Sequence, residues 1–96
     1  MGNLKQLSDF FSAIAKDGRI GVTHIAVYSA LLTYRVNNGC RNPIHVYSRD
    51  IMPLAKISAS TTYHRCMKQL SEYGYIRYQP SFKCNQASRI FFKEIP

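Results

Sequence analysis

Carboxylates are scarce in this 96-residue sequence, which has five Asp and Glu against 13 Lys and Arg. The five are widely separated, and the three histidines have no evident partners. Catalysis needs several groups converging in one pocket, and this distribution indicates no such cluster. Neither a glycine-rich phosphate loop nor a nucleophile motif is present. These absences argue against an enzyme.

Cysteine is also scarce, and an odd count without paired spacing does not indicate a disulfide framework. No histidine is spaced from a cysteine as in a structural zinc site, so we expect no metal and no other cofactor. Cys66 falls on an apolar stripe and is expected to be a small core residue. The three cysteines are Cys40, Cys66 and Cys84.

Long apolar runs are absent, so no segment is expected to cross a bilayer. No signal-peptide pattern is recognisable, and we expect a cytoplasmic protein without a membrane partner. A hydrophobic content of 46% is typical of a globular domain, and the length suits one domain with a modest core. We therefore expect a single domain over residues 1–96, with no evident small-molecule ligand.

Positive charge is what the sequence has in excess, with a formal net charge of +8. Such a balance favours a polyanion as partner, namely DNA, RNA or an anionic membrane surface. The basic residues are spread along the chain and form no run. This spread indicates a folded basic face rather than a disordered basic arm.

Residues 58–80, SASTTYHRCMKQLSEYGYIRYQP, carry the clearest pattern. Apolar side chains recur at the helical period and predict one amphipathic helix. Ser58 or Ser60 can cap its start, and Gly74 suits the left-handed position after its last turn. Residues 75–79 alternate in polarity and predict a strand. The apolar stripe consists of Tyr63, Cys66, Met67, Leu70 and Tyr73.

The opposite face of this helix carries donors and cations, with Glu72 as its acid. Short polar groups and an arginine near a helix N-terminus suit the major groove of DNA. A polar outer face is equally what any surface helix has, so both interpretations stay open at this point. The residues of this face are Thr61, His64, Arg65 and Lys68.

An amphipathic helix is predicted over residues 4–16, and residues 1–18 are expected to form the N-terminal helical part of the domain. Apolar residues recur along it at spacings of three, four and three. The helix can pack on its own domain or form the contact of a homodimer. The stripe consists of Leu4, Leu7, Phe11 and Ile14, widened by Phe10.

A second helix is predicted over residues 23–37, capped by Thr23 and stopped by Asn38-Gly39. Apolar side chains surround most of it, so we expect it to be the central core helix. They are Ile25, Val27, Tyr28, Leu31, Leu32, Tyr34 and Val36.

The remaining elements are short. Residues 44–47 predict a strand. Ser48 is expected to cap a short helix over residues 49–55 that includes Pro53. The inward side chains of that helix are expected to be Ile51, Met52, Leu54 and Ala55.

Residues 75–79 and 89–94 are expected to pair around a polar loop. Three aromatic side chains on these strands are expected in the sheet core rather than on a base-stacking platform. These are Tyr78, Phe91 and Phe92.

This order of elements predicts an α+β, mainly α fold: a winged helix-turn-helix with an extra N-terminal helix and a small antiparallel sheet. The ending Leu70-x-x-x-Gly74-x-Ile76 resembles the second helix of winged helix-turn-helix proteins. More narrowly, TTYHRCMKQLSEYGYI with the following RYQPS resembles small regulators of bacterial mobile elements and conjugative transposons. The resemblance covers residues 44–95. Pro53 and the serines and threonines of the second helix depart from the common pattern.

The resemblance implies double-stranded DNA binding by a transcription regulator or by an accessory factor in excision or replication. Residues 59–73 would enter the major groove, and residues 80–89 would reach the backbone or minor groove. The alternatives are a protein-interaction module with weak or no DNA binding, and an RNA-binding role. The expected DNA-binding residues are Ser48, Arg49, Ser60, Thr61, Thr62, His64, Arg65, Lys68, Lys83, Asn85, Gln86 and Arg89.

Overall fold

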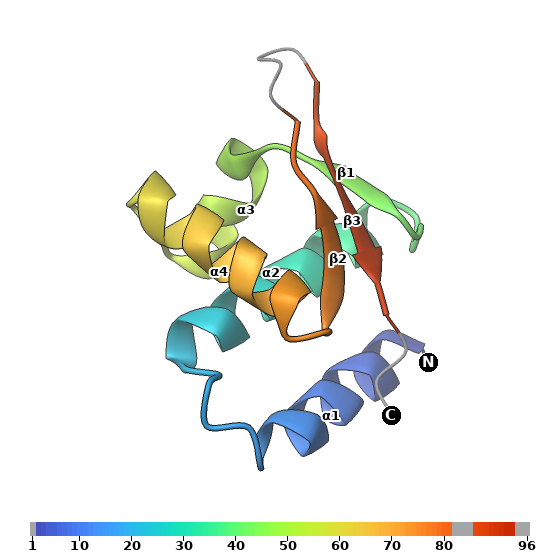
Figure 1. The fold of residues 1–96 in the computed structure, drawn as a ribbon. Coiled ribbons are helices and arrows are strands. Elements are labelled where there is room, and N and C mark those ends of the chain that lie inside the picture. The colour runs from blue at the N-terminus through green and yellow to red at the C-terminus, as the bar shows by residue number, and fades with distance from the viewer. Residues whose placement is uncertain (1, 82–85, 94–96) are drawn as a thin grey trace.

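The helices precede most of the sheet along the chain, in an α+β arrangement that is mainly helical (Figure 1). The computed structural model describes residues 2–81 and 86–93, with side chains from Lys5 onward. The elements are α1 (Gly2–Ile14), α2 (Val22–Asn37), β1 (Ile44–Val46), α3 (Ser48–Ala55), α4 (Ser60–Glu72), β2 (Ile76–Gln79) and β3 (Ser88–Phe92).

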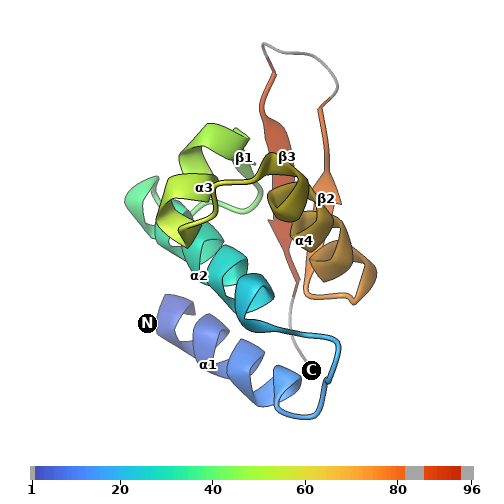
Figure 2. The same ribbon diagram turned by 90° about the vertical axis from the view of Figure 1, so that its left-hand side faces the viewer.

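The three strands form one antiparallel sheet in the order β1-β3-β2. Ile90 at the centre of β3 lies opposite Ile44 of β1 and Tyr78 of β2. The helices lie on one side of this sheet, as the two views in Figures 1 and 2 show. The fold class agrees with the sequence prediction, and the element order is compatible with winged-helix topology.

Helix α2 forms the centre of the core, as its apolar circumference predicts. It is contacted by α1, α3 and α4. Val27, Tyr28, Leu31 and Leu32 are buried as predicted, but Ile25 and Tyr34 are half-buried and Val36 is 47% exposed. The chain leaves α2 through Asn38 and Gly39, where Gly39 has a φ of 86°. This position favours glycine because it has no Cβ.

Helix α1 packs on its own domain, alongside α2 (Figure 2). Phe10 is fully buried, and its ring stacks on Tyr28 with a centroid distance of 3.8 Å. The edge of Tyr75 meets Phe10 at 5.3 Å. Phe11, which was expected on the apolar stripe of this helix, is instead 45% exposed. The buried face of α1 is therefore centred on Phe10, and the homodimer contact stays a prediction.

The predicted Ser and Thr caps are wrong for all three helices that follow. The N-cap residues are Gly21 for α2, Tyr47 for α3 and Ala59 for α4. Helices α2 and α3 thus begin one or two residues earlier than predicted, which places Thr23 and Ser48 inside them. Ser58 lies before the α4 cap, and Ser60 is the first residue of that helix.

Side chains inside the first turn replace those caps. His24 Nδ1 accepts a hydrogen bond of 3.0 Å from the Gly21 N–H, and Asp50 Oδ2 accepts one of 3.0 Å from the Tyr47 N–H. Each bond satisfies an amide at the helix start from the third helical position, as in half of a capping box. Choosing the nearest Ser or Thr from the sequence therefore misplaces both starts.

Helix α3 differs from the prediction on its outer side. Ile51 and Ala55 are buried as expected, but Leu54 is 46% exposed. Pro53 lies inside the helix, beyond its first turn, and supplies no backbone N–H to the preceding turn; the helix ends two residues later. Lys56 then adopts a left-handed conformation with a φ of 60°, and the Ile57 N–H donates to the Met52 carbonyl at 2.9 Å. The left-handed residue and this hydrogen bond end α3 and turn the chain sharply toward α4.

The turn between α1 and α2 is tied to the turn between α4 and β2. The Asp17 carboxylate accepts bonds from Arg19 at 2.8 and 2.9 Å and from the Tyr75 hydroxyl at 2.6 Å. The Arg19 guanidinium lies 4.2 Å from the centre of the Tyr73 ring. The bonds from Arg19 and then from Tyr75 hold the pKa of Asp17 well below its usual range. Burial, then the bond to Asp17, raises the pKa of Tyr75 to about 12.

We expect Asp17→Asn to lower the melting temperature most at neutral pH. The folded-state pKa lies below the unfolded value of about 3.9, so this stabilisation is present above about pH 4 and is lost as pH falls further. The difference in melting temperature between parent and variant should therefore shrink below about pH 4. Thermal melts across a pH series test this.

Asp9→Asn is the matched control, because Asp9 is paired only loosely with the exposed Lys5 of α1 at 3.9 Å. Such a pair contributes little to stability. If the melting temperatures of Asp17→Asn and the parent differ by the same amount at pH 7 and at pH 2.5, the prediction is contradicted.

Candidate nucleic-acid interface

The outer face of α4 presents the polar residues that the sequence predicts. Thr61, His64, Arg65 and Lys68 are exposed. The opposite side of the helix is buried, with Tyr63, Cys66, Met67 and Leu70 each at most 2% exposed. The apolar stripe is thereby confirmed, apart from Tyr73, which is half-buried beneath Arg19.

The remaining predicted residues of α4 lie in its first turn. Ser60 is exposed and Thr62 is half-buried. Lys56 and Ser58, in the turn before α4, are exposed as well. The start of α4 thus offers hydroxyls and a cation to solvent, while its end carries the exposed carboxylate of Glu72.

A polar hollow of about 140 Å³ lies where α3, α4 and the loop end of the β2–β3 hairpin meet. It brings together three predicted residues that are far apart in the sequence: Ser48 from the start of α3, His64 from α4, and Gln86 from before β3. The ring of His64 meets that of Tyr63 edge-on at 5.1 Å. The other lining residues are Val46, Tyr47, Tyr63, Tyr78, Ser81 and Ser88.

Arg49 lies at the start of α3, close to this hollow. It is exposed, and its guanidinium lies 4.1 Å from the centre of the Tyr47 ring. Stacking on the ring orients the planar guanidinium while leaving its N–H groups available to an acceptor. The neighbouring Asp50 carboxylate bonds to the Tyr47 amide.

Of the four predicted wing residues, the structure describes Gln86 and Arg89. Lys83 and Asn85 lie outside the described residues, and Gln86 is exposed beside the hollow. Arg89 lies within β3, opposite His45 of β1 and Gln79 of β2. It is exposed between inward-facing neighbours and so points away from the helices. Arg89 therefore does not join the residues around the hollow.

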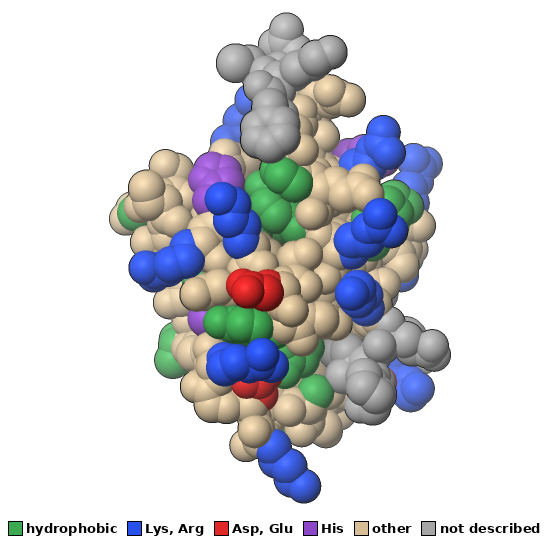
Figure 3. All heavy atoms as spheres, in the orientation of Figure 1, with side chains coloured by type: hydrophobic (Ala, Val, Ile, Leu, Met, Phe, Trp, Pro, Cys, Tyr) green, Lys and Arg blue, Asp and Glu red, His purple; other side chains and the backbone are tan. Residues whose placement is uncertain are grey.

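Basic side chains gather over two regions of the surface in Figure 3, one over α4 and one over the sheet. Carboxylates between them are few in this view. The Asp17 carboxylate is already engaged by Arg19 and Tyr75. The α4 region combines its cations with the polar hollow, and this combination suits a phosphate-bearing partner.

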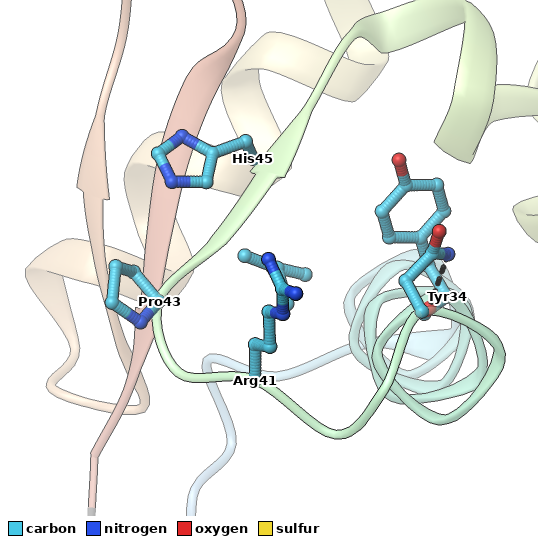
Figure 4. A pocket seen from close by; sticks show the side chains of 6 residues that line it. Tyr34, Arg41, Pro43 and His45 are labelled. Atoms are coloured by element: carbon cyan, nitrogen blue, oxygen red, sulfur yellow. Dashed lines mark hydrogen bonds between the residues drawn. The ribbon is translucent and has the colours of Figure 1, made fainter.

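A second hollow, of about 330 Å³, lies between the C-terminal end of α2 and β1 (Figure 4). Arg41 lies on the α2 side of β1, toward Tyr34, whereas His45 lies on the other side of the strand. The Arg35 Nε donates to the Arg41 carbonyl at 2.9 Å and so fixes the loop that carries Arg41. None of the predicted residues lines this hollow, which is formed only when β1 folds back beside α2.

The sulfhydryl and metal chemistry of the described residues is limited. Burial raises the pKa of Cys66, which makes its thiol less reactive, and Cys40 is exposed. No group of three or more His, Cys, Asp or Glu residues in the described chain could hold a metal ion. Among the helices of the described residues, none has the length and apolar character needed to span a membrane.

Searches against protein-family models, curated proteins and solved structures find no match to this chain.

Proposed function

We propose that the protein is a winged-helix protein that binds duplex DNA through α4 and the polar hollow beside it. The observation that carries the proposal is the convergence of Ser48, His64 and Gln86 from three separate elements next to the basic face of α4. An ordinary surface helix does not need polar groups from two other elements at its side. Duplex DNA lying along α4 would meet all three.

In the proposed complex, α4 lies in the major groove. Its 13 residues span about 20 Å at a rise of about 1.5 Å per residue. Thr61, His64 and Arg65 face the base edges, and Arg65 can donate two bonds to guanine. Lys68, one turn further along, reaches phosphate. Ser48 and Arg49 position the backbone through a hydroxyl and a cation.

This proposal gives the chain a role as a transcription regulator or as an accessory factor of a mobile element, in the cytoplasm. The N-terminal part of a recognition helix penetrates deepest, and here it carries Ser60, Thr61 and Thr62. Hydroxyls of this kind contact several base edges or a phosphate without strong preference. We therefore infer that most affinity comes from phosphate contacts.

We expect duplex binding to weaken steeply with salt. If about five phosphates are neutralised, log K should fall with log salt with a slope near −4 to −5. Fluorescence anisotropy of a labelled duplex, titrated at several salt concentrations, measures this slope. A flat response, or no binding at low salt, would contradict the proposal and favour a protein-interaction module instead.

A further inference from the structure

The face of the sheet turned away from the helices carries a basic and aromatic surface that the α4 site does not use. We call it the outer sheet face. Side chains alternate along each strand, so the neighbours of the buried Ile44, Ile76, Ile90 and Phe92 point outward. The outer sheet face consists of His45, Arg77, Gln79, Arg89, Phe91 and Lys93.

The strand register places these side chains in rows around Phe91. Arg77 lies directly opposite Phe91, and Arg89 lies between His45 and Gln79 in the next row. Along β3, Arg89 precedes Phe91 by two residues, about 7 Å at the rise of a strand, and the exposed Lys93 follows directly after the strand. An aromatic ring is therefore bordered by cations in both directions.

Phe91 is half-buried, although the sequence pattern predicts it in the core. Phe92 and Tyr78 do face the helices, but the alternation of β3 turns Phe91 outward. The Arg77 guanidinium lies 5.5 Å from the centre of its ring. None of the three strands contains an acidic residue. Within these strands, positive charge therefore surrounds a partly accessible ring with no carboxylate among the cations.

Two side-chain contacts hold this face in place. Asn42 accepts a bond of 3.0 Å from the Phe92 N–H and donates one of 3.2 Å to the Phe92 carbonyl, so its amide continues the pairing of β1 with β3. The Gln6 amide donates to the Lys93 carbonyl at 3.2 Å. A pre-ordered face loses less entropy on binding.

We propose that the outer sheet face binds single-stranded nucleic acid, with Phe91 stacking on a base and Arg77, Arg89 and Lys93 contacting the flanking phosphates. Aromatic side chains among cations are the usual means of holding single strands, because every base has a π-face. In a duplex the bases stack on one another and offer no free face to Phe91. An acidic peptide would use the cations but not the ring.

This surface lies on the side of the sheet away from α4, and the inference does not depend on the proposed duplex binding. The two activities have different residues and different substrates. A protein with both could hold a duplex on α4 and an adjacent unpaired strand on the sheet.

The test uses fluorescein-labelled dT12 and a labelled duplex of mixed sequence, each titrated by anisotropy at low salt. Phe91→Leu keeps apolar bulk but removes the π-face, and Phe91→Tyr is the matched control that keeps it. Phe91→Leu should weaken dT12 binding at least about fivefold. Phe91→Tyr should bind dT12 like the parent, and both variants should bind the duplex like the parent.

Arg65→Ala on α4 should leave dT12 binding unchanged. Failure of the parent to bind dT12 would overturn the inference, as would unchanged dT12 binding by Phe91→Leu. Equal losses for dT12 and duplex in Phe91→Leu would also overturn it, because the face would then not be selective for single strands.

Mapping on the unaltered protein keeps the inference testable if Phe91→Leu does not fold. Amide chemical shifts are followed by NMR while unlabelled dT6 is added. Shifts concentrated on β3 and Arg77 would support the inference. Shifts confined to α4, or none at all, would overturn it whatever the duplex titration shows.

Discussion

Phe10→Ala is expected to lower the free energy of unfolding by about 3–5 kcal/mol, the usual loss for a fully buried phenylalanine. The side chain is 0% exposed, stacks on Tyr28 and meets the edge of Tyr75. Its removal would leave a cavity where α1, α2 and the start of β2 meet. Domains of this kind are stable by about 5–15 kcal/mol, so much of the total would be lost. Urea unfolding measures the change.

Phe11→Ala is the matched control, because it removes the same ring from the next position of the same helix. Phe11 is 45% exposed, so its removal should change the free energy of unfolding by less than about 1 kcal/mol. Equal losses for the two variants would contradict the structural account of α1. If Phe11→Ala instead lowers the free energy of unfolding strongly, by an amount that depends on protein concentration, the result would support the predicted homodimer contact.

Arg65→Ala should weaken binding to the preferred DNA site by about 1–3 kcal/mol more than binding to random duplex. In the proposed complex this variant loses a bidentate contact to guanine, and such a contact discriminates among bases. The side chain is exposed, so the fold should be retained. The experiment needs a preferred site, obtained by selecting bound sequences from a random pool, and then paired anisotropy titrations.

Lys68→Ala is the matched control on the same face of α4, three residues further along. A phosphate contact carries no sequence information, so both duplexes should be bound more weakly by a similar factor. The salt slope should become shallower by about one. If Arg65→Ala remains folded and binds both duplexes like the parent, the outer face of α4 is not the surface that contacts the bases.

Helix α4 and the hairpin after it could be predicted because local signals agree there. The apolar stripe, Gly74 and the alternation in β2 each depend on neighbours in the sequence. Gly74 has the expected left-handed φ of 91°, and the Tyr75 N–H donates to the Leu70 carbonyl at 3.0 Å. Where several local preferences favour the same structure, tertiary contacts rarely change it.

The misplaced residues are those whose environment depends on distant parts of the chain. Phe10 and Phe11 are equivalent by composition, and the position of Tyr28 decides which of them is buried. The α2 start depends on the His24 side chain, which also contacts Gln69 of α4 at 2.7 Å. The prediction that Phe91 lies in the core followed the general preference of aromatic side chains. The register of β3 instead places Phe91 on the outer face of the sheet.

The candidate site was predictable as a set of residue types but not as a geometry. Periodicity places Thr61, His64, Arg65 and Lys68 on one face of a helix. It cannot reveal that Ser48 and Gln86 reach the same hollow, because that depends on how α3 and the hairpin pack beside α4. Nor can it separate Arg89 from this group, since the separation follows from strand pairing.

The contacts that secure α1 also bear on the order in which the chain folds. Gln6 reaches Tyr28 and the carbonyl of Lys93, partners 22 and 87 residues away, and Asp17 reaches Tyr75 across 58 residues. Closing such long loops loses more chain entropy than forming the α3–α4 turn or the β2–β3 hairpin. We therefore expect the contacts of α1 with Tyr75 and Lys93 to form after the α3–α4 turn and the β2–β3 hairpin, although α1 is synthesised first.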